Sequence, residues 1–401
     1  MLNRPAPTAR LPLPEFVALL AMVFATVAFS IDAMLPALPV IAEALTPEAV
    51  NRAQLVVTAF MAGMGIGTLI SGPISDAIGR KRMMTLGFLI YMVGAALAMA
   101  AGSLTLLLVA RFIQGLGASG PRIAGQAMVR DLYEGREMAR ISSFVMMVFI
   151  LVPAIAPSVG ALIIHLSGWR GVFAAFILFG AVAMVWLNLR QPETLPPQRR
   201  RPFRAATLRA GALEVLTHRQ VVMITLVLSL GFGQMLALLS SAQQLFAAYG
   251  RGAQFPIWFA VMALIGGTAG LLNARLVMRV GMRRMARAAY IMQIGSSALF
   301  LLTLILGPLP EPWRFVTFFL WAQSVFFMAG ITFGNLNAMA LHQMGHIAGM
   351  AASVIAAVST LLSVAIAVPV GLLFDGTALP AATATLICST LAATLMTQIE
   401  D

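Results

Sequence analysis

One carboxylate, Asp32, stands deep inside a long apolar stretch of the chain, in the sequence FSIDAMLPALP at residues 29–39. A charged side chain in the middle of a bilayer is costly, so an acid at such a position usually marks the path of a proton or another ion. The chemistry that Asp32 predicts is therefore reversible protonation inside a membrane.

Composition indicates that lipid surrounds most of this chain. Hydrophobic residues make up 60% of the 401 residues and charged residues 10%, whereas about a quarter of a soluble protein is charged. Apolar blocks long enough to cross a bilayer as helices recur along the chain. We therefore predict an all-α membrane protein with twelve transmembrane helices. The predicted spans are 15–40, 50–73, 83–102, 104–130, 138–165, 168–189, 219–245, 254–278, 284–306, 313–341, 346–373 and 378–398.

The basic residues predict which way these helices face, because Lys and Arg beside a span are retained on the cytoplasmic side. With the amino terminus inside, only four of the 26 Lys and Arg residues fall in outer loops, namely Arg52, Arg170, Arg251 and Arg314. Both termini are therefore expected in the cytoplasm. The same distribution accounts for the net charge of +12, so nucleic acid is not an expected partner.

One long polar connection divides the predicted helices into six and six. We expect an N-terminal six-helix bundle at residues 1–189, a cytoplasmic linker at 190–218 and a C-terminal six-helix bundle at 219–401. The short sequences GRKRM (79–83) and GMRRM (281–285) occupy corresponding places in the two halves. Their recurrence suggests an internal repeat, which is common in transporters.

Arg111 is a second charge within an apolar block, and a guanidinium does not shed its proton to escape lipid. Asp32 lies about eight residues before the outer end of its predicted helix, and Arg111 about seven after the outer start of its own, so both lie roughly 10–12 Å from the outer face. We therefore expect that the two side chains can meet. Our hypothesis is that Asp32 takes up a proton from outside and releases it inward, under the influence of Arg111 and of desolvation. The alternative is a static ion pair that joins the first helix to the fourth.

The loop after the second predicted helix reads GPISDAIGRKRM (72–83), in which two glycines permit a tight turn, an acid stands between them and a basic cluster follows. This pattern resembles the cytoplasmic signature of the major facilitator superfamily. We call it the gate motif, with the residues Gly72, Asp76, Gly79, Arg80, Lys81 and Arg82.

The resemblance implies contacts that hold the two halves together at the cytoplasmic face. Asp76 would lie near the start of the eleventh helix, at the positive end of its dipole, and Arg80 or Arg82 would pair with Asp131. The alternative is a charged turn that only sets topology. Met278 stands where the second copy would carry the acid, so a second set of such contacts is not expected.

Two further segments resemble signatures of the same superfamily. RFIQGLGASG (111–120) carries Gly115 and Gly117, which allow a neighbouring helix to approach closely. PAIAPSVGALI (153–163) resembles the antiporter signature of the drug exporters in this superfamily. Its residues Pro153, Pro157 and Gly160 predict a kink that changes as the cavity opens, and ordinary tight packing is the alternative.

The segments LPALP (35–39), VRDLYEG (129–135) and FGNLNAMALHQMGHIAGMAAS (333–353) resemble the Bcr/CflA branch of proton-coupled drug exporters. The resemblance implies a monomer in the bacterial cytoplasmic membrane that exports small hydrophobic drugs or toxic compounds in exchange for protons, by alternating access. A proton symporter that imports a small metabolite is the first alternative, and a membrane sensor or scaffold is the second.

Other polar residues within the spans are candidates for the substrate cavity. Arg122 could bind anionic or polar substrate groups, or could extend to the inner interface. For the amides, hydrogen bonds between helices are the commoner use. The amide residues predicted to line the cavity are Gln114, Gln234, Asn335 and Asn337.

The chain carries no phosphate-binding loop of the Walker type and no motif of a nucleophilic or zinc-dependent hydrolase. We therefore expect neither an enzyme nor an ATP-driven pump, and no cofactor. His342 and His346 are spaced to share a helix face but have no further ligands nearby in the sequence, so no metal site is predicted.

Overall fold

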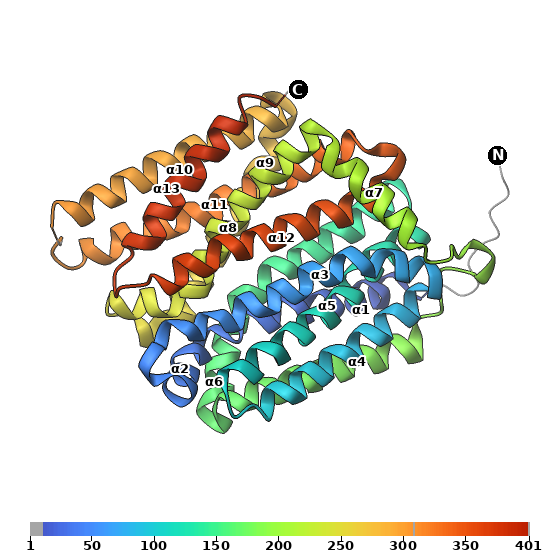
Figure 1. The fold of residues 1–401 in the computed structure, drawn as a ribbon, viewed down its shortest axis with the longest axis horizontal. Coiled ribbons are helices and arrows are strands. Elements are labelled where there is room, and N and C mark those ends of the chain that lie inside the picture. Colours follow the sequence, from blue (N-terminus) through green and yellow to red (C-terminus); the bar gives the residue numbers. More distant parts are fainter. Residues whose placement is uncertain (1–10, 308, 400–401) are drawn as a thin grey trace.

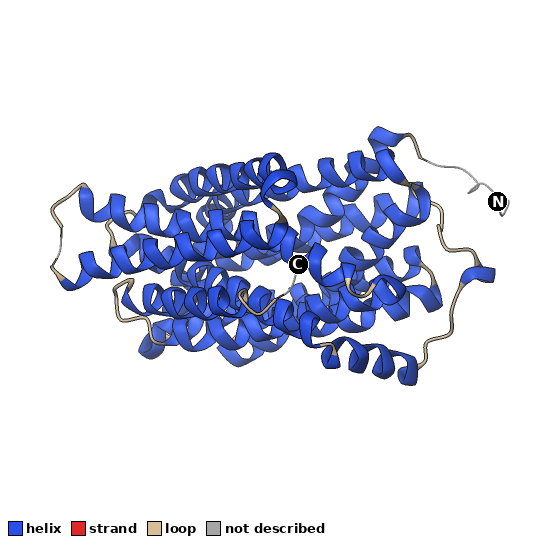
Figure 2. Ribbon diagram, turned by 90° about the horizontal axis from the view of Figure 1, so that it is seen from above, coloured by secondary structure: helices blue, strands red, loops and turns tan. Residues whose placement is uncertain are grey.

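The computed structural model describes residues 11–307 and 309–399, and for residues 135, 136, 139, 140, 142–150 and 207 it describes the backbone alone. Every regular element within these ranges is a helix (Figure 2). Ten of the helical segments are long and apolar enough to cross a membrane. The all-helical prediction is thus confirmed for the described residues, and twelve remains the predicted number of spans.

The helices form two groups that are joined by a connection with a helix of its own (Figure 1). The first group contains α1 (Leu13–Asp32), α2 (Leu38–Leu45), α3 (Leu55–Ile78), α4 (Arg80–Met99), α5 (Leu104–Leu132) and α6 (Gly135–Arg190). The connection contains α7 (Ala205–Thr217). The second group contains α8 (Arg219–Ala248), α9 (Phe255–Val280), α10 (Met282–Ile305), α11 (Trp313–His342), α12 (Ala348–Leu372) and α13 (Leu379–Leu395). Short 3-10 helices are η1 (Leu35–Ala37), η2 (Pro47–Gln54), η3 (Pro197–Arg199), η4 (Gly252–Gln254) and η5 (Gly345–Ile347).

Three elements differ from the predicted spans in an instructive way. The first span is not one helix, because α1 ends at Asp32 and the chain continues through η1 into α2. Pro36 causes this, since it has no N–H to offer to the carbonyl of Asp32 four residues earlier. The fifth and sixth spans follow each other without a loop as the two parts of α6, and the helix is broken between them at Gly168, with φ of 71°, where the predicted sixth span begins. The last helix, α13, has only 17 residues.

The two groups meet along α3 and α12, which lie side by side in Figure 1. We call the end of the molecule that carries the gate motif and α7 the inner end, following the predicted orientation, and the opposite end the outer end. At the outer end Asn51 donates hydrogen bonds to the carbonyls of Leu372 and Phe374, at 3.3 and 2.6 Å. Gln54 contacts Ser241 and Gln244 there. These contacts close the outer end between the groups.

Within the first group, glycines allow helix backbones to touch. A Cβ atom on Gly115 would meet the carbonyl of Phe60 on α3, and one on Gly117 would meet the backbone of Tyr91 on α4. The close approach predicted for this pair of glycines is thus confirmed. Because lipid offers no hydrophobic driving force between helices, such contact supplies much of their cohesion.

The two groups repeat one turn. Gly79 separates α3 from α4 with φ 108° and ψ 156°, and Gly281 separates α9 from α10 with φ 89° and ψ 149°. Both values lie in a region that favours glycine. The internal repeat suggested by the two basic sequences therefore extends to backbone geometry.

The packing of α5 predicts the effect of one added methyl group. In Gly117→Ala the new Cβ would lie 2.6 Å from the carbonyl oxygen of Gly87, so the two helices must separate, and we expect the free energy of unfolding to fall by about 1–3 kcal/mol. Thermal unfolding of the purified protein measures this change. The control is Gly270→Ala in α9, where the new Cβ meets nothing within 4 Å and stability should be unchanged or up to about 1 kcal/mol higher. Equal stability of both variants would contradict the packing argument.

Candidate functional site

Asp32 is the last residue of α1, at the bend that Pro36 imposes on the first span. Its exposed fraction is 6%. Among the described residues, no hydrogen bond or ion pair is formed by its carboxylate. A buried carboxylate without a partner is costly when charged, which makes the residue suited to taking up a proton.

The predicted antiporter segment of α6 packs against this bend. A Cβ atom on Gly160 would meet the carbonyl of Ala33, the residue that follows Asp32. Pro157, one turn earlier, is also buried. The only residue with non-helical dihedral angles described within α6 is Gly168, so neither Pro153 nor Pro157 interrupts the helix. The segment thus makes the tight packing contact with α1 that was the alternative interpretation, and the kink stays a prediction.

Arg111 is fully buried, with an exposed fraction of 0%, and its guanidinium is well satisfied. Nε donates to the carbonyl of Val56 at 3.2 Å, Nη2 to the carbonyl of Ser30 at 3.0 Å, and Nη1 to Oε1 of Gln114 at 2.7 Å. The ring of Phe60 lies 4.5 Å from the guanidinium carbon, a distance at which a cation is attracted to the ring face.

The expected meeting of Asp32 and Arg111 does not occur in this structure, since no ion pair joins these two described residues. The depth estimated by counting residues placed Arg111 beside the correct turn of α1, because Arg111 donates a hydrogen bond to the carbonyl of Ser30. It did not give the direction of the side chains, and residues two apart on a helix do not face the same way. Arg111 therefore finds backbone oxygens where a carboxylate was predicted.

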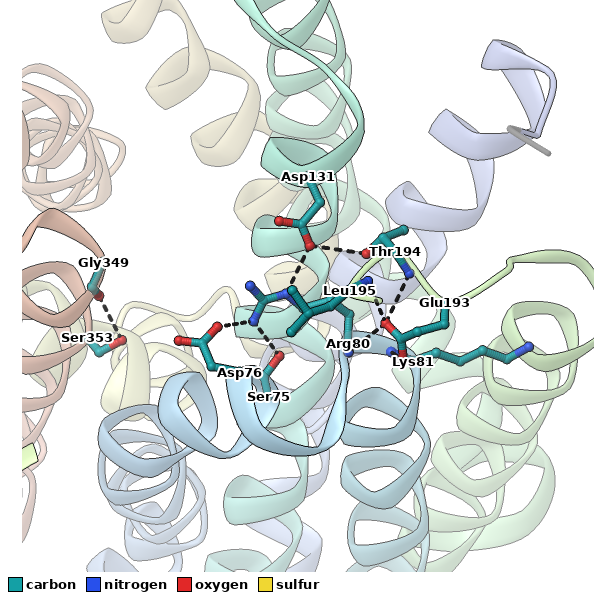
Figure 3. Close-up of polar contacts among 10 residues, drawn as sticks. All are labelled: Ser75, Asp76, Arg80, Lys81, Asp131, Glu193, Thr194, Leu195, Gly349 and Ser353. Carbon is teal, nitrogen blue, oxygen red and sulfur yellow. Dashed lines mark hydrogen bonds and ion pairs between the residues drawn. The ribbon is translucent and has the colours of Figure 1, made fainter. Parts of the chain in front are cut away.

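At the inner end, Arg80 is the centre of the gate motif (Figure 3). Its Nε donates to Oδ2 of Asp131 at 3.0 Å. Nη1 donates to Ser75 at 3.0 Å and also to Asp76. Of the two arginines proposed to pair with Asp131, Arg80 makes the contact and Arg82 is exposed. These bonds tie the ends of α3, α4 and α5 together.

Asp76 also faces the second group. It shares an inner cavity of about 920 Å³ with residues 345–350 at the start of α12, and Figure 3 draws Gly349 and Ser353 beyond it. Gly72, one turn before Asp76, lies against Ser353. Asp76 and the start of α12 are thus neighbours at the inner end, although no hydrogen bond between Asp76 and α12 is found in the described ranges. Met278, at the corresponding place in the second group, is 89% exposed.

The gate includes a residue that sequence reasoning missed, Glu193, in the connection after α6. Its carboxylate accepts hydrogen bonds from the backbone N–H groups of Arg80 at 2.9 Å and Lys81 at 3.2 Å. These are free donors at the start of α4, where a negative charge is stabilised by the helix dipole. Gly79 makes room for it, because a Cβ there would meet the same carboxylate.

Neighbours of Glu193 strengthen this attachment. Thr194 donates its hydroxyl to Asp131 at 3.1 Å, and the backbone N–H of Arg201 donates to the carbonyl of Asp76 at 3.1 Å. The signal in the sequence was available, because residues 190–218 contain many arginines and only two acids, Glu193 and Glu214. The second acid pairs with His346 at 2.6 Å, so each acid joins the connection to one group of helices.

The predicted cavity amides have other uses in this structure. Gln114 is buried and accepts from Arg111. Gln234 is buried and accepts from Ser389 on α13 at 2.9 Å. Asn335 forms two hydrogen bonds with Asn273 on α9, at 2.7 and 3.2 Å. Asn337 is exposed and bonds only to its own helix. A buried amide in lipid needs a partner, and a neighbouring helix supplies it to Gln234 and Asn335, whereas Gln114 bonds to Arg111 of its own helix.

A two-group fold of membrane-spanning helices with this gate motif at its inner end is typical of a membrane transporter. The chain belongs to the Major Facilitator Superfamily, whose family model matches residues 19–369. A solved D-xylose-proton symporter has the same fold, with a TM-score of 0.78 over 96% of this chain and 98% of that one, at 14% identity.

Two relatives indicate which branch of the superfamily this chain resembles. The chain is 29% identical to a bicyclomycin resistance protein homolog of Haemophilus influenzae, over 82% of each chain. It is 30% identical to multidrug resistance protein D of Escherichia coli, over 36% of each. These relatives confirm the resemblance to the Bcr/CflA branch.

The role of Glu193 can be tested by proteolysis. Replacing Glu193 with Ala leaves the first N–H groups of α4 without their acceptor, which costs about 0.5–2 kcal/mol at a helix start. We expect trypsin to cut after the arginines at 199–204 several times faster, because cleavage follows the population of the open connection. The control is Glu48→Ala, which removes an exposed acid at the outer end. An unchanged cleavage rate in Glu193→Ala would show that the carboxylate does not hold the connection.

Proposed function

We propose that this protein exports small, largely hydrophobic drugs or toxic compounds from the bacterial cytoplasm in exchange for protons, acting as a monomer in the cytoplasmic membrane. Membership of the superfamily and the names of the resistance-protein relatives support drug export. Proton coupling is our inference from the site.

The observation that supports proton coupling is that the carboxylate of Asp32, at the bend of the first span, has no partner among the described residues. A charge there has no described cation to compensate it, so a proton neutralises the acid at lower cost than a counter-ion would require. Release of the proton then needs a change in the surroundings of Asp32. The contact between Ala33 and Gly160 supplies a route, since any movement of α6 must displace the backbone beside the acid.

Alternating access also requires that the cavity be closed at the outer end in one state and at the inner end in the other. The hydrogen bonds of Asn51 and Gln54 close the outer end, while the inner end contains the cavity between α3, α5, α12 and the connection. This arrangement supports a state that receives substrate from the cytoplasm. Closing the inner end would bring the first turn of α12 onto Asp76, whose charge suits the positive end of a helix.

A protein that imports a metabolite together with protons can have the same fold, as the solved D-xylose-proton symporter does. Direction of flux separates the two functions. Under an imposed proton gradient, an exporter moves its compound against the direction of the protons, whereas a symporter moves both the same way.

Replacement of Asp32 with Asn tests the coupling directly. In proteoliposomes that contain bicyclomycin, we expect a pH gradient to drive export by the wild type and not by Asp32→Asn, because the amide cannot exchange a proton. Downhill exchange of bicyclomycin should persist in the variant. The matched control is Glu43→Gln, an exposed acid of α2, which should export like the wild type. Full gradient-driven export by Asp32→Asn would remove this residue from the mechanism.

A further inference from the structure

A polar strip on α5 is not explained by the proton chemistry. Ser119 bonds to Ser71 on α3 at 2.8 Å, and Gly125 faces the ring of Phe24 on α1. Because residues four apart project the same way from a helix, Arg122 and Gln126 share the strip between these two contacts. They therefore lie on the side of α5 between its contacts with α1 and α3.

Arg122 has no counter-ion. Its Nη1 lies 3.8 Å from the sulfur of Met64, a weak acceptor, and no described carboxylate lies within ion-pair distance. The side chain is half-buried. Arg111, eleven residues earlier on the same helix, has two carbonyls, an amide and a ring. Arg122 thus differs from Arg111 in lacking groups that compensate its charge. This difference is important because a guanidinium keeps its charge in lipid and an uncompensated charge there is costly.

The side chain of Arg122 also points the wrong way to be an interfacial anchor. Along the helix axes its Cα lies about 27 Å from the outer start of α5, and Met64 about 14 Å from the outer start of α3. The guanidinium thus rises toward the middle of the molecule, away from the inner interface. Of the two uses considered for Arg122, extension to that interface is wrong for this structure.

The inner cavity at the inner end of α5 is lined by several cations. Arg130, two turns below Arg122 on α5, lines the inner cavity together with Arg201 and Arg204 of the connection. None of these three side chains forms an ion pair in the described ranges. The two acids that line the same cavity are already paired, Asp76 with Arg80 and Glu214 with His346. A cavity lined by unpaired cations raises the local concentration of anions.

Gln126 provides a hydrogen-bond donor close to Arg122. It lies one turn below Arg122, is exposed, and has no hydrogen bond to any described residue. Its amide can donate beside the guanidinium, and a charge-assisted pair with a carboxylate is among the stronger hydrogen bonds in proteins.

We propose that Arg122 binds an anionic group of the transported compound, with Gln126 donating beside it, so that the substrates include amphiphilic organic carboxylates. The inference rests on the proposed function for the direction of transport, but binding alone tests it. The carboxylate enters from the inner cavity and supplies the counter-ion that the protein does not.

The test compares two probes that differ only in charge, naphthalene carboxylate and naphthalene carboxamide. Binding is measured by calorimetry at neutral pH on the full chain in nanodiscs of uncharged lipid. We expect the wild type to bind the carboxylate about tenfold or more tightly than the amide, the strength expected of a hydrogen-bonded charge pair. Arg122→Gln should abolish this preference and Arg122→Lys should retain part of it. The control is Arg287→Gln, which removes an exposed positive charge from α10 and should keep the full preference.

Several outcomes overturn the inference. Equal binding of the two probes by the wild type, or no binding of the carboxylate, would do so without any variant. A preference that survives in Arg122→Gln would place the anion site elsewhere. If Arg122→Gln weakens both probes equally, the residue acts on packing rather than on substrate charge.

The outcomes also separate this inference from the proposed function. A carboxylate preference without gradient-driven export of either probe or of bicyclomycin would keep the anion site and remove drug–proton exchange. Gradient-driven export with equal binding of the two probes would do the reverse.

Discussion

A charge inside the hydrocarbon region must be compensated, and the organisation of this protein follows from how that requirement is met. Arg111 is compensated within the fold, by carbonyls of α1 and α3, an amide of its own helix and an aromatic ring. Asp32 has no such partner and can be neutralised by a proton. For Arg122 we propose a partner that comes from outside the protein. In our proposal the three residues thus provide a fixed joint, a site for protons and a site for substrate within one group of helices.

The same region shows how local backbone chemistry supports movement. Pro36 removes the hydrogen bond that would have continued α1 past Asp32, and Gly160 brings α6 against the bend. A bent helix whose free carbonyls are covered by a neighbour can change its shape with less loss of hydrogen bonding than a straight one. The acid therefore stands where the helical hydrogen bonding of the first span is interrupted.

Much of this arrangement could be predicted from the sequence, and the failures have a common physical cause. Apolar length gave the helices, and the resemblance of the gate motif to the superfamily signature gave the contact between Arg80 and Asp131. Residue counting gave the depth of Arg111 but not its rotation about the helix axis, so its contact with Ser30 was mistaken for one with Asp32. Glu193 was missed because its partners lie more than a hundred residues earlier in the chain. The partner of a buried amide such as Asn335 likewise depends on which helices become neighbours.

The paired turns at Gly79 and Gly281 have a mechanical consequence. Their backbones are alike, yet the first is anchored by Arg80, Asp131 and Glu193, while the second exposes Met278 where its acid would stand. Reversal of the chain is thus common to both turns, whereas attachment of the turn to α5 and to the connection is described at the first turn. In the alternating-access cycle that we propose, the ends of α3, α4 and α5 would therefore move together with the connection, whereas α9 and α10 are joined by a glycine turn that lacks these charged contacts.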